Sequence, residues 1–204
     1  MSRINQRRRT VISAALACAL SPSLLWASQR EETLADNVAS TMRRSVNNVS
    51  PARLVFSTPQ AGRQWLYEMS ARLAKFIPDA RERETILINV QYEAKRAGLD
   101  VQLILGLIEV ESMFRRYAIS GVGARGLMQV MPFWVRHIGT SGHNLFEIRT
   151  NLRYGCTILR YYIDRERGDI TPALARYNGS LGRMTYPNKI YAAMRRNWIY
   201  NGAV

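Results

Sequence analysis

The sequence has few cysteines, histidines and acidic residues, and each shortage excludes a class of protein. Cys18 and Cys156 are its two cysteines, too few for a disulfide framework. His137 and His143 are its two histidines, so we expect no multi-histidine metal site and no other cofactor. Only 15 acidic residues stand against 29 lysines and arginines, which gives a net charge of +14. This excess favours an anionic partner: nucleic acid, anionic lipid or an acidic wall polymer.

The chain is long enough to fold around a hydrophobic core without covalent crosslinks. It has 204 residues, of which 47% are hydrophobic and 22% are charged, a composition typical of globular proteins. One domain of roughly 100–200 residues with a short appendage accounts for this length. Disordered and collagen-like chains are therefore excluded.

The first 27 residues have the pattern of a signal peptide. Residues 1–10 contain four arginines and no acid, and residues 11–20 are apolar and small. The segment ends at Ala27, a small residue at a suitable cleavage point. We therefore expect an exported protein. An N-terminal membrane anchor that is never cleaved is the alternative, because Leu25 is a poor match to the small residue wanted two positions before Ala27.

Cleavage after Ala27 would change both the charge and the cysteine count. Removing four of the 29 basic residues leaves 25 against 15 acids, a net charge of +10. Cys156 would then be the single cysteine, and it follows Gly155 in an apolar helical pattern. We therefore expect a buried, inert thiol there. Export also argues against nucleic acid as the partner, and the sequence contains no pattern typical of a nucleic-acid-binding module.

Hydrophobic spacing indicates a mainly α protein with at most a small β element. Apolar residues recur at helical spacing, and Pro or Asp stands at several expected helix starts. Residues 28–80 form an N-terminal helical extension and linker in this interpretation, and residues 81–204 form the main domain. Helices are expected in residues 30–50, 59–77, 80–97, 101–114, 126–138, 149–166, 170–177 and 187–197.

The helix expected at residues 101–114 carries one acid in an unusual setting. The segment reads VQLILGLIEVESMF and is apolar on nearly all sides, so it should be buried. Its acids, Glu109 and Glu111, lie about 200° apart around the helix. Glu111 has apolar neighbours and lies near the helix C-terminus, and both conditions disfavour its charged form. A carboxyl that stays protonated near neutral pH suits a general acid, although an ion pair with Arg115 is the structural alternative.

A glycine-rich segment follows this helix. Residues 120–132 read SGVGARGLMQVMP, with three glycines within six residues. Glycines let the main chain approach a ligand closely. The spacing and the missing lysine do not fit a phosphate-binding loop. Gln129 lies between Met128 and Met131, where its amide suits either hydrogen bonds to a sugar or an ordinary place at the edge of the core.

These segments and several later ones resemble the catalytic domain of the lytic transglycosylases, the lysozyme-like soluble-transglycosylase family. The resemblance covers roughly residues 85–197. It is carried by ESMF at 111–114, AIS at 118–120, GARGLMQVMP at 123–132, Leu145-Phe146, the spacing of Asn151, Gly155 and Leu159, ALARYNG at 173–179, and Tyr186-Pro187.

The resemblance implies a lysozyme-like helical domain with a deep glycan cleft. It implies cleavage of the bond between N-acetylmuramic acid and N-acetylglucosamine in peptidoglycan, without water, to leave a 1,6-anhydro ring. Glu111 would be the single general acid and base. The matching positions expected to hold or orient the sugar are Ser112, Ser120, Met128, Gln129, Tyr177 and Asn178.

The resemblance also bears on location and on rival functions. An exported monomer in the periplasm, acting on peptidoglycan strands, is expected, with membrane association if the N-terminus is retained. A hydrolytic muramidase is one alternative, although the acids that might supply a second carboxylate follow no family pattern: Glu147, Asp164, Glu166 and Asp169. A non-catalytic wall-binding protein is the other, but an intact Glu111-Ser112 pair favours an enzyme.

Overall fold

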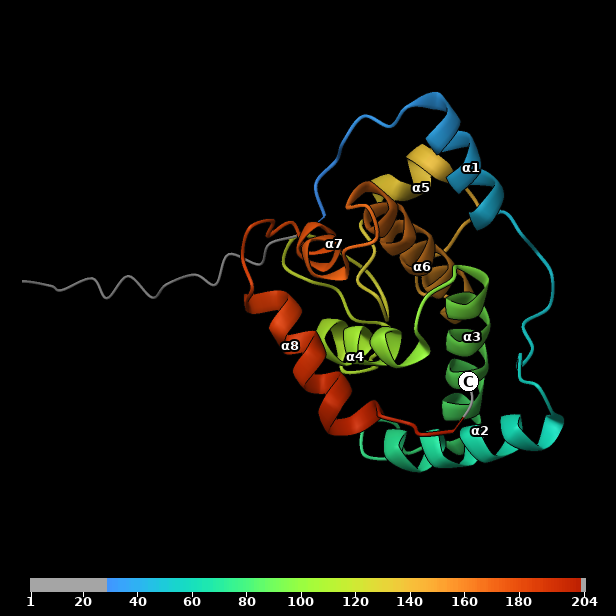
Figure 1. The fold of residues 1–204 in the computed structure, drawn as a ribbon. Coiled ribbons are helices and arrows are strands. Elements are labelled where there is room, and N and C mark those ends of the chain that lie inside the picture. The colour runs from blue at the N-terminus through green and yellow to red at the C-terminus, as the bar shows by residue number, and fades with distance from the viewer. Residues whose placement is uncertain (1–28, 203–204) are drawn as a thin grey trace, which may run out of the picture.

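The computed structural model describes residues 29–202, so the signal segment expected at residues 1–27 lies outside the described residues. The described chain is built from helices joined by loops (Figure 1). Their bounds are α1 Asp36–Val46, α2 Pro59–Leu73, α3 Ala80–Arg96, α4 Val101–Ser112, α5 Phe133–Ile138, α6 Ile148–Arg165, α7 Ile170–Tyr177 and α8 Thr185–Ala193, followed by a π-helical turn, Met194–Trp198.

Several helices begin at the capping residues that the sequence indicates. The side chain of Asp79 accepts a hydrogen bond from the Arg81 amide at the start of α3, and Asp100 accepts one from Gln102 at the start of α4. Asp169 caps α7 in the same way. Each cap satisfies a main-chain donor that lacks a partner within the helix. These starts therefore follow from local sequence.

Helix α4 lies at the centre of the fold, as its apolar sequence predicts. Figure 1 shows it crossed by α8 and adjoining α3. Gly106 of α4 allows the end of α8 to approach closely. A side-chain carbon at position 106 would lie 3.1 Å from both the Ile190 carbonyl oxygen and the Met194 amide nitrogen. The packing of α8 and the π-helical turn on α4 thus depends on a position without a side chain.

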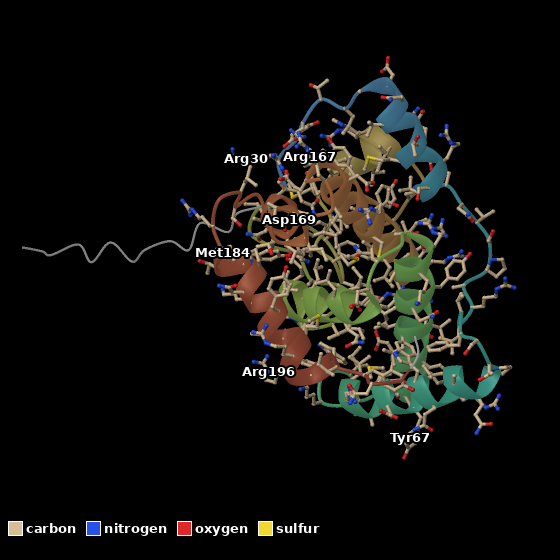
Figure 2. The ribbon with its side chains drawn as sticks, viewed as in Figure 1. Arg30, Tyr67, Arg167, Asp169, Met184 and Arg196 are labelled. Carbon is tan, nitrogen blue, oxygen red and sulfur yellow. The ribbon has the colours of Figure 1, made fainter. Side chains whose placement is uncertain are left out.

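The N-terminal helices share the core of the main domain. Met42 and Val46 of α1 and Trp65 of α2 are buried in the same hydrophobic cluster as α4 and α6. Helix α1 packs on α5 and α6, and α2 packs on α3. The other face of α2 is exposed, and Figure 2 shows Tyr67 projecting from it. Residues 36–73 are therefore built into this fold.

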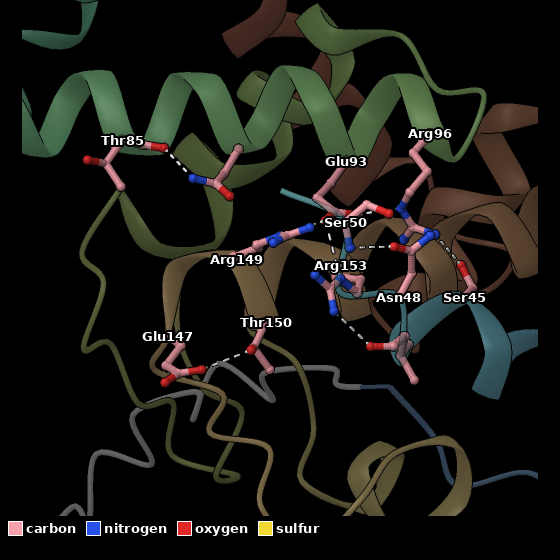
Figure 3. A network of polar contacts seen from close by, with 12 residues as sticks. Ser45, Asn48, Ser50, Thr85, Glu93, Arg96, Glu147, Arg149, Thr150 and Arg153 are labelled. Atoms are coloured by element: carbon pink, nitrogen blue, oxygen red, sulfur yellow. Dashed lines mark hydrogen bonds and ion pairs between the residues drawn. The ribbon is translucent and has the colours of Figure 1, made fainter. Parts of the chain in front are cut away.

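A buried ionic network ties α1, α3 and α6 together (Figure 3). Glu93 of α3 is fully buried and pairs with three guanidinium groups. The Nε atoms of Arg96, Arg153 and Arg149 lie 2.7, 3.3 and 3.5 Å from its carboxylate oxygens. Arg153 also donates to the Val46 carbonyl of α1. The Glu93 carboxylate thus binds three arginines from two helices. One of these arginines, Arg153, links the network to α1.

The mainly α prediction is confirmed, with one local correction. The described residues contain two isolated β bridges, Ile119 with Arg125 and Arg125 with Val130. The helix expected at 126–138 begins only at Phe133. Gly126 and Gln129 adopt positive φ angles of 76° and 48°, which are incompatible with a right-handed helix. Apolar composition alone had suggested a helix where the chain makes turns.

Two further features of the described residues bear on the sequence predictions. The helix expected within residues 30–50 is confined to α1, and residues 29–35 are extended or irregular. None of the helices within residues 29–202 combines the length and apolar character needed to span a bilayer.

Candidate active site

Glu111 lies in the last turn of α4, with its side chain only partly exposed. Its carboxylate accepts a hydrogen bond from the Tyr186 hydroxyl, and the contact is short. Burial raises the pKa of Glu111 from 4.5 to about 7, while the Tyr186 hydrogen bond opposes part of that rise. The alternative expectation was an ion pair between Glu111 and Arg115. In the structure, Arg115 donates to the Ser112 carbonyl instead. Glu111 can therefore hold or release a proton near neutral pH.

Tyr186 contacts Glu111 although no role was expected for it from the sequence. It belongs to the Tyr-Pro pair that carries the resemblance, yet nothing local indicated a contact with Glu111, 75 positions earlier. Tyr186 is 7% exposed and stands in the first turn of α8. The packing of α8 across α4 brings the two side chains together. Burial and the Glu111 charge raise the pKa of Tyr186 well above 10, so it stays a hydrogen donor.

Glu109 has a different role from Glu111, as their separation around the helix predicts. It is buried and accepts hydrogen bonds from Arg196, Asn197 and the Trp198 indole. All three donors come from the C-terminal π-helical turn. Glu109 is thus occupied in fixing the C-terminal turn to α4, whereas Glu111 of the same helix is hydrogen-bonded to Tyr186 of α8.

Ser112 connects α4 to the glycine-rich segment. Its hydroxyl lies 2.8 Å from the Leu127 carbonyl oxygen and 3.2 Å from that of Ile108, and the residue is 2% exposed. The chain then turns sharply, with positive φ angles of 50° at Met113 and 60° at Phe114. The hydroxyl of Ser112 is engaged with main chain in this structure, so its visible effect is to hold the following turn beside Glu111.

The side chain of Asn151 on α6 forms hydrogen bonds with the main chain of the glycine-rich segment. Its amide oxygen accepts from the Met128 amide, and its amide nitrogen donates to the carbonyls of Arg125 and Leu145, all at 2.8 Å. Gly126 is required by this contact, because a side-chain carbon there would lie 2.3 Å from the Asn151 amide nitrogen. One buried amide therefore positions three separate points of the main chain.

Met128, within this segment, has a completely buried side chain. Gly155 of α6 makes room for it, since a side-chain carbon at 155 would lie 2.3 Å from the Met128 sulfur. The family spacing of Asn151 and Gly155 thus has a physical reason: one residue bonds to the segment and the other admits its methionine. Cys156, beside Gly155, is buried and free, as expected, and burial raises its pKa strongly.

Gln129 and Ser120 also stabilise the turns of this segment through hydrogen bonds to main chain. The Gln129 amide donates to the carbonyls of Gly126, at 2.9 Å, and Ala118, at 3.2 Å. The Ser120 hydroxyl accepts from the Ala124 amide at 3.0 Å. Both side chains close turns on either side of the small bridges at Arg125. Their proposed contacts with sugar stay a prediction.

Tyr177 and Asn178 end α7 beside the same segment. The Tyr177 hydroxyl donates to the Met128 carbonyl at 2.8 Å, and the ring is buried. Burial, and next the charge of Glu111, raise the pKa of Tyr177 well above 10, which places it in the electrostatic neighbourhood of the acid. Asn178 is partly exposed and donates to the Ser180 hydroxyl at 3.1 Å. The structure thus gathers the predicted site residues around the segment after α4.

The other acids considered from sequence have structural partners. Glu147 accepts from the Thr150 hydroxyl, Asp164 pairs with Arg160, and Glu166 pairs with Arg176. Asp169 caps α7. Within residues 29–202, no group of three or more His, Cys, Asp or Glu side chains is arranged to hold a metal ion. In the described part of the chain, Glu111 is the acid with a pKa shifted to near neutrality.

A hollow of about 540 Å³ adjoins the end of α4. It is lined by residues 76–78, Glu82 and residues 114–119, so it borders the turn that follows Glu111. Glu111 itself does not line it. The deep glycan cleft expected from the resemblance therefore stays a prediction.

Comparison with known families decides the affiliation. The profile of the Transglycosylase SLT domain matches residues 88–198, more than half of the chain. The chain belongs to this family. The match includes α4, the glycine-rich segment, Asn151, Tyr177 and Tyr186, which are the elements that build the site described above.

Individual relatives agree with that assignment. A transglycosylase of Enterobacteria phage PRD1 is 34% identical over 100 residues, covering 46% of this chain and 37% of the relative. The membrane-bound lytic murein transglycosylase C of Actinobacillus pleuropneumoniae serotype 5b is 35% identical over 123 residues, covering 55% of this chain and 32% of the relative. The chain thus spans about a third of the length of these relatives.

One solved structure is also similar. It is an inactive mutant of the lytic transglycosylase Slt from Pseudomonas aeruginosa, with 25% sequence identity and a TM-score of 0.44. The match covers 77% of this chain and 32% of that structure.

Proposed function

We propose that this SLT-domain protein is a peptidoglycan lytic transglycosylase with Glu111 as its single general acid and base. The observation that carries the proposal is the Glu111 carboxyl, held by Tyr186 and with its pKa raised by burial to about 7. A general acid works best when its pKa lies near the working pH. The family affiliation supplies the substrate class, the glycan strand of peptidoglycan.

The proposed reaction needs one carboxyl and no water. Protonated Glu111 gives its proton to the oxygen between N-acetylmuramic acid and N-acetylglucosamine, and the bond from that oxygen to C1 breaks. The C6 hydroxyl of the muramic acid then bonds to C1 and closes the 1,6-anhydro ring. Its proton passes to Glu111, which restores the acid. An intramolecular nucleophile gains a large effective molarity, so a second carboxylate is not required.

The arrangement around Glu111 supports this single-acid mechanism. Glycosidases that use two carboxylates hold them about 5–9.5 Å apart across the bond they cleave. In the described residues, Glu109 is bound by the C-terminal turn, and Glu147, Asp164, Glu166 and Asp169 are occupied at helix ends or in ion pairs. A hydrolytic muramidase therefore has less support than the transglycosylase.

The surrounding residues would hold the sugar through the segment that they shape. Ser112, Met128, Gln129 and Tyr177 all bond to or pack beneath the chain at 126–131, so their proposed role is to present main-chain groups to the glycan. Ser120 and Asn178 are partly exposed and are the better placed for direct contact. Location in the cell envelope follows from the proposed substrate, and a monomer suffices because the site is formed within one chain.

The test is product analysis of purified sacculi digested by the wild-type protein and by the Glu111→Gln variant. Mass spectrometry should find 1,6-anhydromuropeptides with wild type and none above background with the variant. Products with reducing ends would identify a hydrolytic muramidase instead. Binding of sacculi without any cleavage would identify a wall-binding protein, and equal anhydro product from both proteins would exclude Glu111 as the acid.

A further inference from the structure

The segment that precedes α1 reaches back to the candidate site. Gln29, the first described residue, is 5% exposed although it lies outside any helix. Its amide oxygen accepts from the Met131 amide at 3.3 Å, and its amide nitrogen lies 3.5 Å from the Gln129 carbonyl oxygen. A hydrogen bond between Gln29 and Tyr177 also acts to lower the Tyr177 pKa. Three contacts thus place one side chain beside the predicted sugar-binding segment.

The main-chain groups that Gln29 meets form the outer edge of the small β ladder. Val130 donates to the Arg125 carbonyl and accepts from the Arg125 amide, both at 3.0 Å. In an extended chain, the carbonyl of the preceding residue and the amide of the following one point to the opposite side. Gln129 O and Met131 N therefore form a donor and acceptor pair on the unpaired edge. One amide group can bond to both: its N–H donates to the Gln129 carbonyl, and its oxygen accepts from the Met131 N–H.

An acetamido group of an N-acetylated sugar offers the same two functions as the Gln29 side chain: a carbonyl oxygen that accepts and an N–H that donates. The edge lies beside the end of α4 that carries Glu111, because the Ser112 hydroxyl donates to the Leu127 carbonyl and the Tyr177 hydroxyl donates to the Met128 carbonyl, both at 2.8 Å. Resting on the proposed function, we infer that Gln29 belongs to the substrate-binding site: its amide occupies the acetamido-recognising edge at Gln129 and Met131 and competes with the sugar for it.

Ion pairs hold Glu31 and Glu32 of this segment, and Leu34 packs against the core. Glu31 accepts from His137 at 2.7 Å and lies 3.6 Å from Arg136, while Glu32 pairs with Arg165. These partners are on α5 and α6, and Figure 1 shows the blue segment passing from the side of α7 to α1. Exposed ion pairs of this kind contribute little stability, so exchange of the Gln29 amide for a ligand amide is energetically accessible.

The test compares ligand affinity in Gln29→Ala and in Arg30→Ala, the matched control. Arg30 follows Gln29 in the chain and is exposed (Figure 2 labels it), so its substitution removes charge without touching the amide pair. The probe is chitotriose, an oligomer of N-acetylglucosamine, and binding is followed by calorimetry in a Glu111→Gln background to prevent turnover. We expect Gln29→Ala to bind about two- to tenfold more tightly and Arg30→Ala to bind like its parent.

Two outcomes would overturn the inference. Unchanged affinity in Gln29→Ala would mean that the ligand does not use this edge. Weaker affinity, or a lower kcat with unchanged KM on sacculi, would mean that Gln29 supports the segment rather than competing for it. Failure of the proposed function is recognised separately, because the binding assay needs no catalysis: sacculi that yield no anhydro product would refute the function while the affinity comparison still reports on Gln29.

Discussion

The hydroxyl of Tyr186 donates a hydrogen bond to the carboxylate of Glu111, joining the first turn of α8 to the last turn of α4. The contact favours the charged carboxylate, whereas burial favours the neutral acid, and burial has the larger effect on the pKa of Glu111. Tyr186 thereby orients the Glu111 carboxyl, and its hydrogen bond limits the rise in the pKa of Glu111 to about 7. This pairing is the basis of two predictions.

Replacing Tyr186 by Phe should alter both the rate and its pH dependence. The Glu111 carboxylate loses its donor, so its pKa rises and the alkaline limb of the kcat/KM profile moves to higher pH. The acid also loses its orientation, and we expect kcat to fall by about ten- to hundredfold. The measurement is a pH profile of anhydromuropeptide release.

Tyr191→Phe is the matched control, since Tyr191 lies on the same helix and its hydroxyl pairs with Thr171 at 2.9 Å. It should leave the profile in place. A Tyr186→Phe profile that keeps the wild-type alkaline limb would show that Tyr186 has only a packing role.

The raised pKa of Glu111 also links stability to pH. The folded value of about 7 exceeds the ordinary 4.5, so the folded state binds the proton more tightly than the unfolded chain. The resulting stabilisation is complete below about pH 4.5 and is lost as pH rises through about 7. Glu111→Gln removes this titration. The variant should therefore gain stability over wild type between about pH 5 and 8, by about 1–3 kcal/mol.

Urea unfolding of both proteins at several pH values checks this prediction. The difference in unfolding free energy should be small near pH 4.5 and grow toward pH 8. A constant difference across that range would show that Glu111 has an ordinary pKa in the folded protein.

The network around Glu93 should dominate the stability of the α1, α3 and α6 junction. Glu93→Gln would leave Arg96, Arg149 and Arg153 close together without their shared counter-charge. Breaking a buried ion pair from one side costs about 3–5 kcal/mol. We expect a loss of that size in urea unfolding.

The control for Glu93 is Glu68→Gln, which breaks the partly exposed Glu68–Arg72 pair on α2. Exposed pairs contribute about 0–1 kcal/mol, so this variant should unfold almost like wild type. Similar losses in the two variants would contradict the role assigned to the buried network.

Gly155 should be intolerant of even the smallest side chain. A methyl group there would meet the Met128 sulfur at 2.3 Å and the Met128 Cβ at 2.8 Å, and Met128 is completely buried. Gly155→Ala should lose about 1–3 kcal/mol of stability. It should also lower wall-cleaving activity, because Met128 lies within the segment that borders Glu111.

Gly142→Ala is the corresponding control, since nothing lies within 4 Å of a side-chain carbon built at Gly142. Its stability and activity should be close to those of wild type. A stable, active Gly155→Ala protein would show that Met128 can move without disturbing the site.

Much of the helical framework could be predicted from local sequence because its signals are local. Asp79 and Asp100 cap helices at the expected positions, and α4 is central because it is apolar on nearly all sides. The expected helix at 126–138 was wrong over its first half. Hydrophobicity does not report the positive φ angles of Gly126 and Gln129, which depend on contacts with Asn151 and with distant carbonyls.

The sequence by itself determined the family, the main helices and the identity of the candidate acid, because Glu111 is surrounded by apolar residues of its own helix. Only the tertiary structure decided what holds that acid. Tyr186 meets Glu111 across 75 positions of chain, and Gln29 meets Gln129 across 100. Such contacts arise from the packing of one helix or segment on another, and no local pattern of residues encodes which side chains then face each other.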